Sequence, residues 1–187
     1  MKTLIHEILE LFTNCYGFIS KTISLGSKSD KKQWKGKTTV MNKVTPEEAW
    51  NVLGDFGGLY KFHPDLDTGY VAEGVDGQPG MVRFCSATKP MPPDGNLTTL
   101  WVKEKLLEID QAKQCLSYEI TENNMGFKSY SASMQVLPCE DGRRGSMVEW
   151  SFIADPIPGW TNESFSAYLA QCLVAISRNV EAHVLSC

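Results

Sequence analysis

The chain has 187 residues, of which 42% are hydrophobic and 21% charged, as in an ordinary soluble globular protein with one sizeable core. The formal net charge is −4, and basic residues form no run longer than two, so we expect no nucleic-acid partner. Six scattered cysteines and three histidines offer no zinc-ligand spacing. We therefore expect no metal or other cofactor, and a reducing, cytoplasmic location.

The first 24 residues carry apolar side chains at spacings of three and four, which predicts an amphipathic helix. His6, Glu7 and Glu10 interrupt the apolar run, which argues against a signal peptide or membrane span. The polar face is not notably basic, so we favour packing on the domain or on a partner over contact with a membrane surface. Residues 25–33 are typical of a linker, and we expect the folded domain over residues 34–187.

The domain begins with a predicted strand over 34–44. Thr45, followed by Pro46 and by Glu48 three residues after Thr45, forms a capping box, which predicts the start of a helix. The segment LYKFHP predicts a second short helix that ends before its proline. Strand-like runs separated by turn residues then follow over 67–75, 81–88, 97–109, 115–121, 127–138 and 146–154. A last helix of about 24 residues is predicted to begin after Thr161.

This order of elements predicts an α+β fold. Six consecutive strands joined by short turns favour an antiparallel meander, and the long amphipathic helix must cover one of its faces. A strongly curved sheet closed by one helix can leave an apolar cavity between sheet and helix. Cavities of this kind bind small molecules, so we expect a small, hydrophobic ligand.

Alternation along the strands predicts which side chains face the cavity. Tyr130 and Met134 share the apolar face of 127–138, while Tyr118 and Trp150 lie on the apolar faces of 115–121 and 146–154. In the run LWVKEKL, Glu104 falls on the side of the apolar residues, where an unpaired carboxylate is costly. The run 81–88 has apolar residues at both parities, so its inward face is left open.

Arg83 is the cation best placed to pair with Glu104, because it lies on the preceding strand of the meander. A carboxyl group in an apolar cavity can transfer a proton, and a guanidinium can hold an anionic oxygen. The pattern leaves two other readings open. Arg83 and Glu104 can form a purely structural ion pair, or a bulge can turn Glu104 to solvent. The two tyrosines can equally be core aromatics with satisfied hydroxyls.

Several short motifs occur together and in order over residues 34–185. They are WKGK, PEEAWNVLGDFGGLYKFHPDL, VR, LWVKEKL, YEITE, GFKSYSASMQV, GS and EWSF. In this order the chain resembles the lachrymatory-factor synthase-like proteins of plants, within the Bet v 1-like and START-like (polyketide cyclase) superfamily. The resemblance implies a helix-grip fold, in which a curved seven-stranded antiparallel sheet wraps a long C-terminal helix.

The resemblance also implies a reaction, the isomerisation of an alkenyl sulfenic acid to a thioaldehyde S-oxide, or related isomerase or cyclase chemistry on another plant metabolite. By the VR and WxKEKL motifs, Arg83 would bind the sulfenate oxygen and Glu104 would move the proton. Tyr130 would orient Glu104 or the substrate. The substrate, a hydrophobic or sulfur-containing metabolite, would be bound by Tyr118, Trp150, Phe127, Met134, Phe165 and Leu169.

The alternative is a carrier or sensor of hydrophobic ligands with no catalysis. Hormone receptors that share this fold have a gate loop at about residues 86–96 and a latch loop near 122–127. Here those segments read SATKPMPPDGN and ENNMGF, without the receptors' gate and latch motifs. This argues against hormone sensing but leaves a metabolite carrier open.

Overall fold

The computed structural model describes residues 33–91, 95–139 and 144–186. The predicted N-terminal helix over 1–24 and nearly all of the predicted linker lie outside the described residues, so both stay predictions. Within the described part of the chain, no helix is long and apolar enough to cross a membrane.

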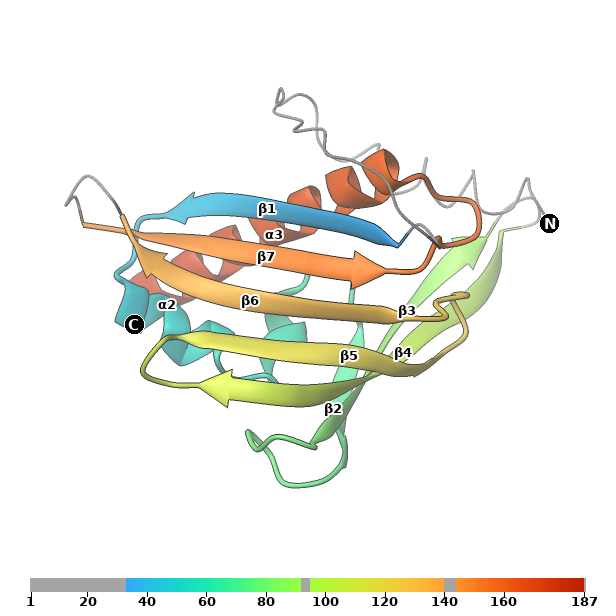
Figure 1. Cartoon of the computed structure of the whole chain (residues 1–187), viewed down its shortest axis with the longest axis horizontal. Coiled ribbons are helices and arrows are strands. Elements are labelled where there is room, and N and C mark those ends of the chain that lie inside the picture. The colour runs from blue at the N-terminus through green and yellow to red at the C-terminus, as the bar shows by residue number, and fades with distance from the viewer. Residues whose placement is uncertain (1–32, 92–94, 140–143, 187) are drawn as a thin grey trace.

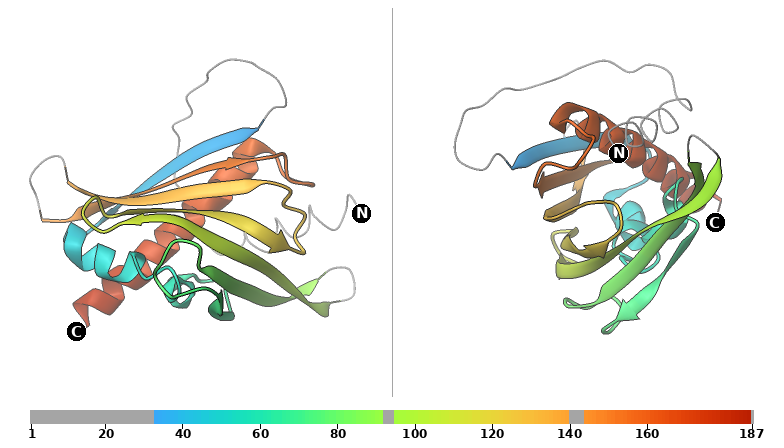
Figure 2. Two further views of the ribbon diagram at one scale, coloured as in Figure 1. Left: turned by 60° about the horizontal axis from the view of Figure 1, so that its bottom comes forward. Right: turned by 90° about the vertical axis from the view of Figure 1, so that its right-hand side faces the viewer.

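Seven antiparallel strands form one sheet in the order β1-β7-β6-β5-β4-β3-β2, so β2 to β7 form the predicted meander and β1 joins at the β7 edge. The sheet curves strongly around one long helix, and its β1 edge lies against that helix (Figures 1 and 2). This arrangement is the predicted helix-grip architecture. The strands are β1 (Trp34–Asn42), β2 (Thr68–Glu73), β3 (Val82–Met91), β4 (Asn96–Asp110), β5 (Cys115–Asn123), β6 (Tyr130–Pro138) and β7 (Ser146–Ala154).

The long helix α3 (Asn162–Leu185) begins after its N-cap Thr161, as predicted, and runs across the concave face of the sheet (Figure 2). Its predicted apolar stripe turns inward, and Leu173 and Val180 are completely buried. Because this stripe meets the inner face of the sheet, helix and sheet share one core. The opposite side of the helix is exposed along its length, as at Ala167, Gln171 and Arg178.

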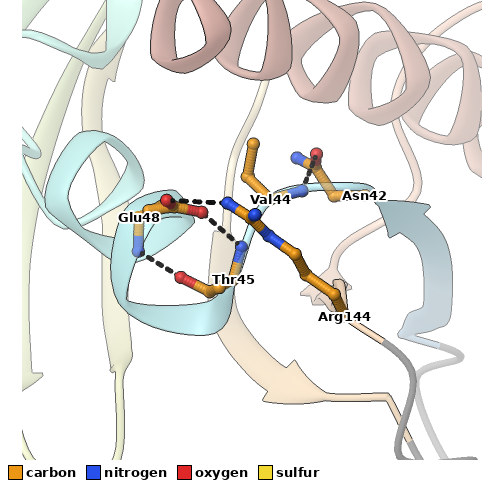
Figure 3. A network of polar contacts seen from close by, with 5 residues as sticks. All are labelled: Asn42, Val44, Thr45, Glu48 and Arg144. Carbon is orange, nitrogen blue, oxygen red and sulfur yellow. Dashed lines mark hydrogen bonds and ion pairs between the residues drawn. The ribbon is translucent and has the colours of Figure 1, made fainter.

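The short helix α2 (Pro46–Leu53) starts with the predicted capping box. The Thr45 hydroxyl accepts from the Glu48 backbone N–H at 3.2 Å, and the Glu48 carboxylate accepts from the Thr45 N–H at 2.8 Å. Arg144 adds an ion pair to Glu48 (Figure 3). The 3₁₀ helix η1 (Leu59–Phe62) follows, and both lie beside α3 on the concave side of the sheet (Figure 2).

The burial of the strands follows the predicted alternation. Tyr130, Met134, Tyr118 and Trp150 are all less than 9% exposed and face α3. Glu104 is also buried, so the reading in which a bulge turns it to solvent is wrong. Two register shifts do occur in β4, at Lys103/Glu104 and between Leu106 and Glu108. The second one moves the inward position from Glu108 to the half-buried Ile109.

Two strand ends differ from the prediction by three residues, and the other differences are of one or two residues. Phe127 lies before β6 rather than in it, because the Asn123 side chain holds that turn by accepting from the Phe127 N–H at 3.0 Å and donating to its carbonyl at 2.9 Å. Strand β3 continues to Met91, because its end pairs with the start of β4 in a long hairpin.

Candidate functional site

A cavity of about 150 Å³ lies between the inner face of the sheet and α3. Most of its wall is apolar or aromatic, with contributions from strands β3 to β7, from α3 and from the segment around η1. All nine residues expected from the sequence line it: Arg83, Glu104, Tyr118, Phe127, Tyr130, Met134, Trp150, Phe165 and Leu169. Their catalytic or binding roles stay predictions.

The most polar feature of the wall is the pair formed by Arg83 and Glu104, which are directly opposite in the β3–β4 ladder. Arg83 Nε donates to Glu104 Oε2 at 2.7 Å, and Arg83 Nη2 lies 2.7 Å from the same oxygen. Their side chains are only 8% and 11% exposed. Charged groups buried this deeply are tolerated when they are paired, so each residue accounts for the presence of the other.

The Arg83 guanidinium is fixed by three further contacts. Its Nη1 donates to the Phe56 carbonyl oxygen at 2.6 Å, and its Cζ lies 3.9 Å from the centroid of the Phe56 ring. The Tyr118 ring is 5.5 Å away. Burial is the largest single influence and lowers the pKa of Arg83, but the charge of Glu104, helped by Cys85, Tyr118 and the hydrogen bond to Glu104, raises the pKa overall. Arg83 is therefore a permanent, rigidly held cation. Both of its contacts with Glu104 use Oε2, and Oε1 takes part in neither.

Two phenols and an indole lie next to this pair. Burial raises the pKa of the Tyr118 hydroxyl, with Glu104 adding to the effect, and burial likewise raises the pKa of Tyr130. Both phenols are therefore neutral donors at ordinary pH. The Trp150 indole lies close to the Tyr118 hydroxyl, yet its fully buried Nε1 has no well-aligned hydrogen-bond partner among the described residues. A buried, unused donor on a cavity wall is a place where a ligand oxygen can bind.

Sequence reasoning missed several polar residues of the wall, chiefly Cys85, His63 and Tyr168. Cys85 follows Arg83 by two residues, so it shares the inward face, and burial raises the pKa of its thiol to about 11. Tyr168 lies on α3, where a helical apolar stripe does not distinguish a cavity-lining side chain from a core side chain. His63 precedes a proline after η1, and no periodic pattern marks it as inward.

The aromatic residues on the other side of β3 explain why its alternation was ambiguous. Phe84 stacks on Tyr70 of β2 at 5.1 Å and on Trp101 of β4 at 5.9 Å, all between ring centroids. This outer stack makes the convex face of β3 apolar as well. The inward set of the strand is Arg83, Cys85 and Ala87, since these are the β3 residues that line the cavity.

Comparison with known proteins agrees with this architecture. The sequence profile of a family described as "Polyketide cyclase / dehydrase and lipid transport" matches residues 33–181. Among solved structures, ginseng major latex-like protein 151 from Panax ginseng is 21% identical, with a TM-score of 0.63 over 82% of this chain and 98% of that one. The XoxI protein from Bacillus cereus is 20% identical, with a TM-score of 0.63 over 81% and 96%. Ara h 8.0201 is 21% identical, with a TM-score of 0.62 over 83% and 100%. Identities this low support the shared fold alone.

Proposed function

The chain belongs to the polyketide cyclase / dehydrase and lipid transport family, and from its cavity we propose that it is a small-molecule proton-transfer enzyme. The observation that carries the proposal is the buried Arg83–Glu104 pair on the wall of an apolar cavity. The pair offers a fixed cation and a carboxylate oxygen within one site. These are the two groups needed to hold an anionic oxygen and to move a proton.

The size of the cavity supports a small substrate. A dry protein cavity of about 150 Å³ holds a molecule of the size of benzene. The cavity found here has a similar volume of about 150 Å³, far less than a long-chain lipid needs. A short alkenyl sulfenic acid suits this volume, and its apolar chain suits the aromatic wall.

The proposed reaction is the isomerisation of an alkenyl sulfenic acid to a thioaldehyde S-oxide. Glu104 accepts the proton of the S–O–H group through its carboxylate. The electrons of the carbon–carbon double bond then take up a proton at the carbon far from sulfur, and a carbon–sulfur double bond forms. Glu104 supplies that proton, so the step needs no oxidant, reductant or other reactant. Arg83 stabilises the oxygen of the sulfenate as its charge develops.

Neutral phenols have the right chemistry to assist. Tyr118 and Tyr130 stay protonated because their pKa values are raised, so each can donate to the sulfenate oxygen or to Glu104. The unused N–H of Trp150 offers a third donor at the same end of the cavity. Such a cluster of buried donors favours an oxygen-bearing ligand over a pure hydrocarbon.

A carrier of small hydrophobic ligands is the second candidate. It is favoured by the way in which Arg83 is held, because contacts with Glu104, the Phe56 carbonyl and the Phe56 ring use much of the guanidinium. An ion pair of this kind can serve structure alone. A carrier would then bind its ligand in the apolar part of the cavity and leave it unchanged.

The test is an assay in which an alkenyl sulfenic acid is generated in the presence of purified protein. We expect wild-type protein to form the thioaldehyde S-oxide and Glu104→Gln to lose at least about a hundredfold in turnover, because the amide keeps the shape but cannot accept the proton. Binding of a small alcohol to both proteins is measured by calorimetry, which checks that the cavity is intact in the variant. Turnover unchanged in Glu104→Gln would refute the proton-transfer role, and binding without turnover in wild type would identify a carrier.

A further inference from the structure

His63 is one of the polar residues of the cavity wall that the proposed reaction does not use. It ends η1 at the His63–Pro64 peptide, with an extended backbone, and its partly buried ring lines the same cavity as Arg83 and Glu104. The backbone N–H of Asp65 donates to His63 Nδ1 at 3.2 Å. Because Nδ1 accepts this hydrogen bond, it carries no proton, and the proton of the neutral ring must be on Nε2.

The surroundings of His63 keep the ring neutral. Burial lowers its pKa to about 4; the carboxylate of Asp65 opposes this shift, while the charges of Arg83 and Lys89 add to it. Asp65 is itself engaged, since Lys89 Nζ lies 2.6 Å from its Oδ1. His63 is therefore a neutral imidazole with one N–H to offer. None of the described residues forms a hydrogen bond with Nε2.

His63 reaches the cavity from another part of the chain than the ion pair. Arg83 and Glu104 stand on β3 and β4, whereas His63 stands on the segment between η1 and β2 and is anchored beside the Lys89–Asp65 pair. Lys89 stands six residues after Arg83 on β3, yet the charge of Arg83 still acts on the His63 imidazole, so a short ligand can reach both groups. The anchor of the imidazole and the Arg83–Glu104 pair thus belong to different regions of the wall, with apolar side chains such as Ala87 and Leu100 also lining the cavity.

We propose that His63 binds a second polar group of the ligand through its Nε2–H. The ligand of this cavity is then a small molecule with two polar ends, an oxygen acid at Arg83–Glu104 and a hydrogen-bond acceptor at His63, joined by a short apolar body. The inference rests on the proposal that this cavity is the ligand site. It adds a specificity-determining residue and narrows the substrate to bifunctional compounds.

Two substitutions distinguish the roles of the two ring nitrogens. In His63→Asn, the amide oxygen takes the place of Nδ1 and still accepts from the Asp65 N–H, but the donor at Nε2 is lost. In His63→Gln, the amide N–H can take the place of Nε2 and restore that donor. Because His63 is only partly buried, we expect both variants to fold.

The probes are two series of flexible alcohols matched in number of non-hydrogen atoms. The diols are 1,4-butanediol, 1,6-hexanediol and 1,8-octanediol, and their matched monoalcohols are 1-pentanol, 1-heptanol and 1-nonanol. Affinity is measured by calorimetry and by NMR of ¹⁵N-histidine-labelled and ¹⁵N-tryptophan-labelled protein. With three histidines in the whole chain, the His63 signals are assigned directly from the two variants.

We expect the free protein to show a neutral His63 with its proton on Nε2 at pH 7. At least one diol length should shift the Nε2–H signal and bind about fivefold more weakly to His63→Asn, the effect of one hydrogen bond. His63→Gln should recover most of that loss, and the monoalcohols should bind all three proteins alike.

The outcomes distinguish this inference from the proposed function. If diols and monoalcohols shift the Trp150 indole signal but His63→Asn weakens neither series, the role of His63 is refuted and the cavity stands. The role is equally refuted if the proton is found on Nδ1. If no probe perturbs the signals of either Trp150 or His63, both the proposal that the cavity binds ligand and the proposed role of His63 are refuted.

Discussion

Lys103 and Glu104 are neighbours in β4, yet they face opposite sides of the same sheet. Lys103 pairs with Glu122 at 2.9 Å on the convex face, where the two side chains are 26% and 55% exposed. Glu104 pairs with Arg83 at 2.7 Å on the concave face, where the two side chains are 11% and 8% exposed. The distances are nearly equal, so distance does not separate the two pairs. Burial separates them. Water screens the charges of the outer pair, whereas the inner charges are shielded from water and depend on each other.

The largest effect, a loss of stability, is expected when one partner of the inner pair is removed. Arg83→Met leaves the Glu104 carboxylate buried without its cation, and we expect the free energy of unfolding to fall by about 3–5 kcal/mol. Urea denaturation monitored by circular dichroism measures this. The double variant Arg83→Met/Glu104→Met removes both charges and should recover most of the loss. A single variant as stable as wild type would mean that the pair is not interdependent.

A second expectation concerns the pH dependence of stability that His63, another titratable group of the cavity wall, should produce. Its folded pKa of about 4 lies below the ordinary value of 6.5, so the unfolded chain takes up a proton first as the pH falls. Stability is therefore fully present above about pH 6.5 and is lost between pH 6.5 and 4, by on the order of 2 kcal/mol. The difference in unfolding free energy between wild type and His63→Asn, measured across this range, isolates the contribution. A difference independent of pH would contradict an imidazole that the fold keeps neutral.

A smaller effect is expected from removing one hydroxyl beside the inner pair. Tyr118→Phe keeps the ring that packs 5.4 Å from Phe56 but deletes a donor close to Glu104. We expect turnover to fall about fivefold, as for the loss of one hydrogen bond. Steady-state kinetics on the sulfenic acid checks this, with Tyr70→Phe on the convex face as the matched control. Equal kinetics in the two variants would remove Tyr118 from the proposed site.

The smallest effect is expected on the convex face. Lys103→Met breaks the ion pair with Glu122, but both partners are solvated, and we expect no measurable change in unfolding midpoint or in turnover. Thermal denaturation and the same assay serve as readouts. A clear destabilisation would show that the outer pair matters as much as the inner one, which the comparison excludes.

The concave face was predictable where a strand alternates cleanly. Tyr130 and Met134 on β6, and Trp150 on β7, faced inward as expected, because polar residues such as Ser133 and Ser151 mark the other face and bond to each other at 2.8 Å. Glu104 was identifiable because a charged residue interrupted an apolar alternation. The position of Glu104 also indicates Arg83 as its partner, because Arg83 lies on the strand that precedes the strand of Glu104 in the hairpin.

Other features depended on contacts that no local pattern encodes. The inward face of β3 stayed open because the outer stack of Tyr70, Phe84 and Trp101 makes both of its faces apolar. His63 lies in an irregular segment after η1, and its place in the cavity wall follows from the packing of that segment against α3 and β3. Periodicity describes single elements, whereas the position of such a residue is decided by how elements far apart in the chain meet.

The most direct test compares Glu104→Gln with Glu122→Gln, since each substitution removes one carboxylate charge from the same sheet on opposite faces. Turnover of the sulfenic acid and binding of a small alcohol are measured on both proteins. The account predicts at least about a hundredfold loss of turnover in Glu104→Gln with alcohol binding retained, and wild-type behaviour in Glu122→Gln. Equal turnover in the two variants would contradict the central claim that the buried carboxylate moves the proton.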